Sequence, residues 1–140
     1  MRTDRAMRAL LVAVGVLVGA IVLASSALDE GEVVTLVTKS GDGVVHETPL
    51  WIVEWNGQVY LRAGSSRTEW LARLRAYPEV TLHRGDETLS FTAVPSDDPK
   101  TRAAINERMA AKYGFADRLW GHLSDRQRSV PILLEPRAGT

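Results

Sequence analysis

A nine-residue stretch, "RAGSSRTEW" at positions 62–70, holds the residues best suited to bind a ligand. Gly64, Ser65 and Ser66 combine small side chains with hydroxyl groups and would allow a close approach to the backbone. Arg62 and Arg67 add guanidinium groups whose forked geometry suits a phosphate. The stretch therefore predicts a phosphate-binding loop.

The same stretch also has a purely structural interpretation. Ser66, with Glu69 three residues later, matches a capping box and predicts that a helix begins there. The first amides of that helix would point outward with partial positive charge, which suits an anion. If the loop only caps a helix, Arg62 and Arg67 are simply solvated. Trp70 lies just past the serines, so we include it among the candidate ligand contacts.

Other chemistries have little support in the sequence. The three histidines, His46, His83 and His122, lack the spacing of a metal site, and no cysteine is present. The two serines of the loop lack the G-x-S-x-G pattern of a nucleophile elbow. Lys plus Arg and Asp plus Glu both total 17, without the clustered basic face that nucleic acid requires. We expect no metal and no nucleic-acid partner.

Residues 1–28 read as a hydrophobic leader. No charged residue occurs from Ala9 to Leu28, a run long enough at ~1.5 Å per residue to cross a bilayer. Arginines at positions 2, 5 and 8 precede this run and acidic residues follow it, which places the C-terminal domain outside the cytoplasm. We predict a single-pass membrane anchor through residues 9–28. Cleavage near Ala27, which would give a secreted or periplasmic protein, is the alternative.

Residues 29–140 are expected to form one domain of strands with inserted helices. Alternating or β-branched segments separated by glycine turns, such as Asn56-Gly57, predict strands over 33–38, 44–54, 58–63, 79–84, 88–94 and 129–136. Pro131 cannot donate to a ladder and predicts that the last strand lies at an edge. Mostly consecutive antiparallel strands favour a closed or split barrel, because closure removes exposed edges.

Two helices are expected within this domain, over about 68–76 and 98–113, followed by a short helical piece around 116–119. Asp98 is a suitable N-cap for the second helix, and Gly114 a suitable exit. Ile105, Met109 and Tyr113, spaced by four, predict its buried stripe. The fold class is therefore mainly β with short helices (α+β): a split antiparallel β-barrel of about six strands, preceded by one N-terminal transmembrane or signal helix.

The order of motifs from residue 34 to residue 82 resembles the FMN-binding split-barrel superfamily, which includes pyridoxamine-phosphate-oxidase-like and deazaflavin-dependent reductases. The shared pattern is a strand, a glycine turn, an apolar strand with an aromatic residue, a hairpin, a phosphate loop and a short helix. Within that superfamily the chain looks closest to the 2255 family of domains of unknown function, through "PLWIVEWNGQVYLRAG", "EW" and "AAKYG".

The resemblance implies a homodimer with a flavin or deazaflavin in a groove between the subunits. Ser65, Ser66 and Arg67 match the superfamily's phosphate loop by position. Thr38 and Lys39 fall where its first strand approaches the cofactor. On this basis we predict cofactor binding by these residues together with Arg62 and Trp70, and an oxidoreductase with an unknown small-molecule substrate.

A second function stays open on the same residues. Thr68 stands where oxidases of this kind commonly carry a lysine, and apolar Leu50 and Trp51 replace a basic residue on the second strand. These departures favour the alternative of a non-catalytic binding or interaction module that has lost the cofactor.

Overall fold

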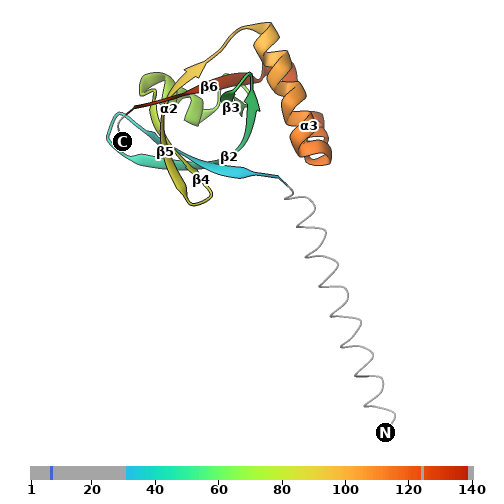
Figure 1. The fold of residues 1–140 in the computed structure, drawn as a ribbon, viewed down its shortest axis with the longest axis horizontal. Coiled ribbons are helices and arrows are strands. Elements are labelled where there is room, and N and C mark those ends of the chain that lie inside the picture. The colour runs from blue at the N-terminus through green and yellow to red at the C-terminus, as the bar shows by residue number, and fades with distance from the viewer. Residues whose placement is uncertain (1–6, 8–30, 124, 139–140) are drawn as a thin grey trace. The chain divides into compact units, whose positions relative to one another are not determined.

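The strand-forming segments after residue 30 form a closed antiparallel barrel with helices packed on it (Figure 1). The computed structural model describes Met7, residues 31–123 and residues 125–138, without the side chains of 122 and 123. The leader predicted over residues 9–28 lies outside the described residues. Within the described part, no helix has the length and apolar character needed to cross a bilayer.

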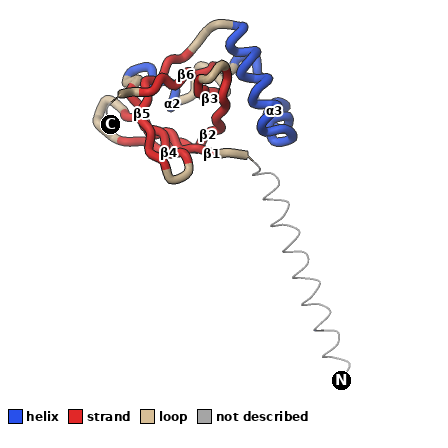
Figure 2. The backbone as a smooth tube through the Cα atoms, viewed as in Figure 1, coloured by secondary structure: helices blue, strands red, loops and turns tan. Residues whose placement is uncertain are grey.

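Six strands close the barrel, in the order β1-β2-β3-β6-β5-β4 with β4 returning to β1 (Figure 2). Their bounds are β1 Val33–Lys39, β2 Val45–Trp55, β3 Gln58–Ala63, β4 Glu79–Arg84, β5 Glu87–Pro95 and β6 Val130–Pro136. Asn56 and Gly57 both take positive φ angles, 52° and 71°, and form the tight turn between β2 and β3. The predicted strands and this hairpin are confirmed.

The prediction that the last strand is an edge strand is wrong. β6 pairs with β3 on one side and with β5 on the other. Pro131 lies opposite Arg62, and although it has no N–H, its carbonyl accepts a hydrogen bond from the Ser96 N–H at 2.9 Å. A closed barrel has no edge, so closure overrides the local preference of proline.

Strand β2 is apolar on both faces. On the inner face, Ile52 is fully buried in the cluster that fills the barrel. On the outer face, Val53 belongs to a second cluster, against which Trp51 and Trp55 pack. Helix α3 (Pro99–Leu123) covers this outer face and runs along one side of the barrel (Figure 1).

The buried stripe of α3 is confirmed at Ile105, Met109 and Tyr113, all of which belong to the outer cluster. Asp98 caps the helix by accepting hydrogen bonds from the Lys100 N–H and from the hydroxyl of Thr101. Gly114 interrupts the helix with φ 53° and ψ −117°, the positive φ that its sequence position predicted. The helical segment that follows this break has a different direction from the first.

Helix α2 (Glu69–Ala76) buries Trp70, Leu71 and Leu74 in the inner cluster. The capping box predicted at Ser66 is wrong, because the N-cap is Thr68 and its side chain makes no capping hydrogen bond. The Thr68 hydroxyl instead donates to the Ser65 carbonyl at 2.9 Å and closes a turn ahead of the helix.

Tyr113 joins the start of the barrel to α3. Its ring stacks on Trp51 with centroids 4.4 Å apart and planes 9° apart. Its hydroxyl accepts the Ile52 N–H at 2.9 Å and lies 2.6 Å from the Glu32 carbonyl oxygen. An added Cβ on Gly31 would lie 2.4 Å from this ring, so only glycine fits beside it.

The Glu32 carboxylate makes a second connection in the same region. It accepts hydrogen bonds from Arg84 at 2.7 and 3.0 Å and from Lys112 at 2.8 Å. These bonds, the one from Arg84 first, lower the pKa of Glu32 from its ordinary 4.5 to about 2.

Replacing Tyr113 by Phe tests the hydroxyl connection. The buried Ile52 N–H loses its acceptor, so we expect the free energy of unfolding to fall by ~1–3 kcal/mol in urea titrations. Tyr77→Phe is the matched control, because Tyr77 is exposed. Equal effects of the two substitutions would contradict the proposed role of Tyr113.

Acid titration tests the Glu32 connection. Because the folded-state pKa is depressed, the stabilisation by Glu32 is complete above pH 4.5 and is lost as the pH falls towards 2. Since the side chain is 34% exposed, screening limits this contribution to ~1 kcal/mol. Urea unfolding between neutral and acidic pH should therefore show a smaller acid loss in Glu32→Gln than in the wild type, with the exposed Glu107→Gln as control. Identical acid limbs for Glu32→Gln and the wild type would refute the assignment.

Candidate functional site

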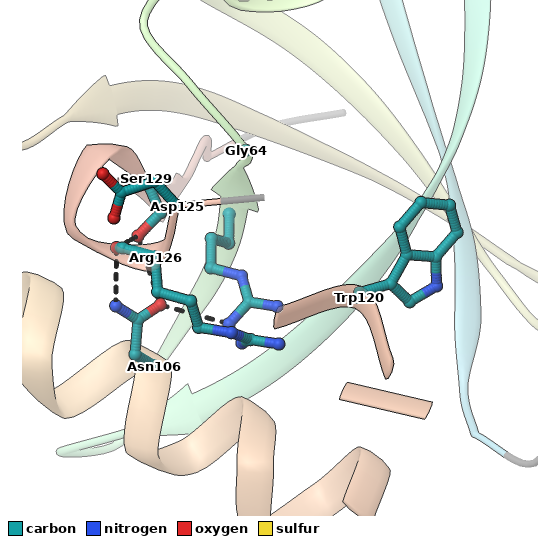
Figure 3. Close-up of a pocket in the computed structure, with 7 residues that line it drawn as sticks. Gly64, Asn106, Trp120, Asp125, Arg126 and Ser129 are labelled. Atoms are coloured by element: carbon teal, nitrogen blue, oxygen red, sulfur yellow. Dashed lines mark hydrogen bonds between the residues drawn. The ribbon is translucent and has the colours of Figure 1, made fainter. Parts of the chain in front are cut away.

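A small cavity of about 150 Å³ at the end of β3 gathers polar side chains from several elements (Figure 3). These elements are β3, α3 and the short 3₁₀ helix η1 (Arg126–Arg128), together with the residues that flank η1. The lining residues are Arg62, Gly64, Asn106, Trp120, Asp125, Arg126 and Ser129. Folding of the chain thus brings together segments that are far apart in the sequence.

Two arginines of this cavity share one buried carboxylate. Asp117 is only 2% exposed, and its Oδ1 accepts from Arg62 Nη2 at 2.7 Å and from Arg126 Nη1 at 2.6 Å. Arg126 also donates to the backbone carbonyl of Asp117. Within this cluster one carboxylate faces two guanidinium groups, and the carboxylate of Asp125, which also lines the cavity, offsets the remaining positive charge.

Asn106 fixes the orientation of this pair. Its Oδ1 accepts from Arg62 Nη1 and from the Ser129 hydroxyl, both at 3.1 Å. Its Nδ2 donates to the Arg126 carbonyl at 3.1 Å. Burial lowers the pKa of the Arg62 guanidinium, and the hydrogen bond to Asp117 counteracts that effect. Arg62 therefore stays a cation and is held in one orientation.

The backbone at Gly64 is open on the side where a side chain would stand. No atom lies within 4 Å of a Cβ built on this residue. The turn that follows is closed by the Ser65 hydroxyl, which accepts from the Arg67 N–H at 3.3 Å, and Ser66 and Arg67 are exposed. A ligand in the cavity could therefore reach both this backbone and the exposed loop.

The predicted site residues divide into two groups in the structure. Arg62 lines the cavity with its side chain 12% exposed, and the loop from Ser65 to Arg67 follows the cavity residue Gly64 directly. Ser65, Ser66 and Arg67 themselves do not line the cavity, and two of the nitrogens of Arg62 are already engaged with Asn106 and Asp117.

The other three predicted residues lie elsewhere. Trp70 is 6% exposed and packs in the barrel interior. Thr38 is fully buried, and its hydroxyl accepts from Arg73 Nε at 2.9 Å. Lys39 lines a different cavity. None of the three lines the cavity at the end of β3.

Sequence reasoning missed Asn106, Asp117 and Arg126. One signal was available, because Asp117 continues the spacing of four set by Ile105, Met109 and Tyr113. A carboxylate on a buried helix face requires a cationic partner. The identity of that partner could not be read from spacing.

This arrangement is suited to binding an anion. The guanidinium groups of Arg62 and Arg126 supply donors in fixed positions, as phosphate recognition requires, whereas the Ser129 hydroxyl already donates within the cluster. Among residues 31–123 and 125–138, no three His, Cys, Asp or Glu side chains are grouped so that they could hold a metal ion.

Solved structures share this architecture. HutZ, a haem storage protein from Vibrio cholerae, superposes with a TM-score of 0.61 at 18% identity, over 83% of this chain and 89% of that one. A pyridoxamine 5'-phosphate oxidase assigned in Listeria innocua gives 0.59 at 16% identity, over 81% and 90%. The chain has the split-barrel fold. An F420 reductase also matches this split barrel, with a TM-score of 0.52 at 19% identity over 81% and 92%.

No family model and no curated protein matches the sequence. The superfamily-level fold expected from the sequence is confirmed by the solved structures, whereas the closer likeness to the 2255 family stays a prediction.

Substitution of Asp117 by Asn tests whether this carboxylate organises the split barrel's cavity. The variant leaves two partly buried guanidinium groups without their shared counter-charge, so we expect a loss of ~3 kcal/mol in the free energy of unfolding. Asp97→Asn, at an exposed position, is the control and should change stability little. If both variants unfold at the same urea concentration as the wild type, Asp117 does not hold this cluster together.

Proposed function

We propose that the protein binds the phosphate of a flavin- or deazaflavin-type cofactor at the end of β3 and acts as an oxidoreductase. One observation carries the proposal: Arg62 and Arg126 share a single carboxylate beside the open backbone of Gly64. The names of the structural neighbours, an oxidase and an F420 reductase among them, give it support.

The residues present fit the phosphate part of such a cofactor. Arg62 and Arg126 keep N–H groups beyond those bound to Asp117, and Arg67 is exposed on the adjoining loop. A cavity of about 150 Å³ is smaller than the ~300–1,000 Å³ of ordinary ligand pockets, so it has no room for the ring system. When bound, such a cofactor supplies hydride-transfer chemistry, and the residues of the chain bind and orient it.

A homodimer would provide the part of the site that binds the ring system of the cofactor. Beyond the break at Gly114, α3 carries large apolar side chains at its surface: Phe115 is 67% exposed and Trp120, at the rim of the cavity, is 57% exposed. Exposed apolar side chains grouped in this way are typical of an interaction surface. A second copy seated here would cover them and supply a wall for the ring.

We also propose that residues 9–28 hold the protein in a membrane as a single-pass anchor, with the barrel domain outside the cytoplasm. The support is the uncharged run between basic and acidic flanks. Cleavage near Ala27 gives the alternative of a secreted or periplasmic protein.

A non-catalytic binding module is the second candidate function. The observation that favours it is the engagement of both arginines by Asp117, which already compensates part of their charge. In this case the cluster would serve the docking of α3 and η1 rather than a ligand.

Ligand titration of the purified full chain separates the two functions. We expect FMN to bind at least about tenfold more tightly than riboflavin, which lacks the phosphate. Arg126→Gln should weaken FMN binding by about tenfold or more, whereas Arg118→Gln, at an exposed position on α3, should not change it. Absorbance and fluorescence titrations measure both effects.

The deazaflavin cofactor and haemin complete the set of probes. Binding of the deazaflavin cofactor in place of FMN keeps the proposal and fixes the cofactor type. Absence of binding by both FMN and deazaflavin selects the non-catalytic module, and binding of haemin alone overturns the flavin proposal.

A further inference from the structure

A second cavity, of about 350 Å³, opens at the seam between β1 and β4. It shares no lining residue with the cavity at the end of β3. The residues around it are Val37, Lys39, Ala76, Tyr77, Pro78, Glu79, Val80, Thr81 and Arg137. Its volume falls within the ~300–1,000 Å³ of pockets that hold small organic ligands.

The seam opens because the ladder between β1 and β4 is short. Pairing covers only Thr35 to Val37 on β1, opposite Thr81 to His83 on β4. β1 nevertheless continues to Lys39, and β4 already begins at Glu79. The last two residues of β1 and the first two of β4 are therefore unpaired with each other, and the end of α2 forms part of the wall there.

The walls of this seam cavity are apolar and polar in nearly equal parts. Val37, Ala76 and Pro78 contribute aliphatic surface, and Tyr77 contributes a half-exposed ring. Such walls favour a ligand with an apolar body, since its burial removes apolar surface from water. They offer few of the fixed donors that a phosphate needs.

Two cations stand at the seam cavity on different segments. Lys39 is exposed and makes no hydrogen bond or ion pair with the described residues. Arg137 Nη2 lies 3.6 Å from Glu79 Oε1, and both side chains are well exposed, at 39% and 69%. An exposed pair of this kind is weak and can exchange for another carboxylate. With Glu79 counted, the cavity carries a net charge of one positive unit, which matches a singly charged anion.

We propose that the seam cavity binds an organic monocarboxylate. The apolar body of the ligand lies against the aliphatic walls and the Tyr77 ring, and its carboxylate takes Lys39 and Arg137 as partners. The proposal stands independently of the cofactor site, because no residue is shared between the two cavities.

The experiment uses the full chain with two probes of matched shape. 4-Phenylbutyrate carries a negative charge, and 4-phenylbutyramide is uncharged. Calorimetric or NMR titration should show saturable binding of the acid and at least about tenfold weaker binding of the amide. Lys39→Gln and Arg137→Gln should each weaken binding of the acid by about threefold or more, while Lys100→Gln, at an exposed position on α3, should leave it unchanged. Thermal melts of the variants verify that they fold.

Several outcomes overturn the proposal. One is equal binding of the acid and the amide, and another is unchanged binding of the acid in both cavity variants. A third is the absence of saturation up to about 20 mM acid. That concentration lies well above the dissociation constant expected for a ligand of this size at ~0.3 kcal/mol per heavy atom. Competition between FMN and the acid for one site would also refute it. FMN affinity in Arg137→Gln should equal that of the wild type, so failure of the cofactor proposal and failure of this one are told apart.

Discussion

The apolar outer face of β2 has to be covered by another element. The position of α3, and with it the residues at the end of β3, depends on how this face is covered. Trp51, Val53 and Trp55 would otherwise expose a row of large apolar side chains, since Leu50 and Ile52 face the barrel interior instead. Helix α3 supplies the cover with its buried stripe. The stack of Trp51 on Tyr113 fixes where the helix lies along the strand.

The placement of α3 then determines the electrostatics at the end of β3. Once Tyr113 is fixed, Asp117 follows beyond the break at Gly114 and accepts a hydrogen bond from Arg62. Burying that carboxylate is costly unless it is fully bonded, and the bond to Arg126 in η1 supplies the second partner. The same contact orders the segment that leads into β6. The charge beside the cavity is therefore a consequence of how the barrel is closed.

Local patterns in the sequence predicted the parts of the fold that depend on neighbouring residues. The hairpin at Asn56-Gly57 and the stripe of α3 follow from turn chemistry and helical spacing. Predictions that depended on distant partners fared worse. Pro131 was placed at an edge because proline lacks a donor, yet closure pairs β6 on both sides.

The candidate site could be predicted only in part, for the same reason. Arg62 and the following loop were identified from their own residue types, but the partner of Arg62 lies 55 residues further along the chain. Lys39 was grouped with the loop by resemblance, whereas its position depends on where the β1–β4 ladder ends. Trp70 was read as a ligand contact, and its helical spacing with Leu71 and Leu74 instead buries it.

The two cavities use cations in physically different ways. At the end of β3 the guanidinium groups are held by a buried carboxylate and an amide, so their remaining donors are oriented before any ligand arrives. Such preorganisation favours an anion that accepts several directed hydrogen bonds, as a phosphate does. At the seam the cations are exposed and adaptable, and apolar side chains form only part of the wall. Selection there must come from the shape of an apolar body, with charge acting as a weak filter. The first cavity selects a ligand by directed hydrogen bonds, and the second selects one by the shape of its apolar body. A single small ligand would therefore not satisfy both.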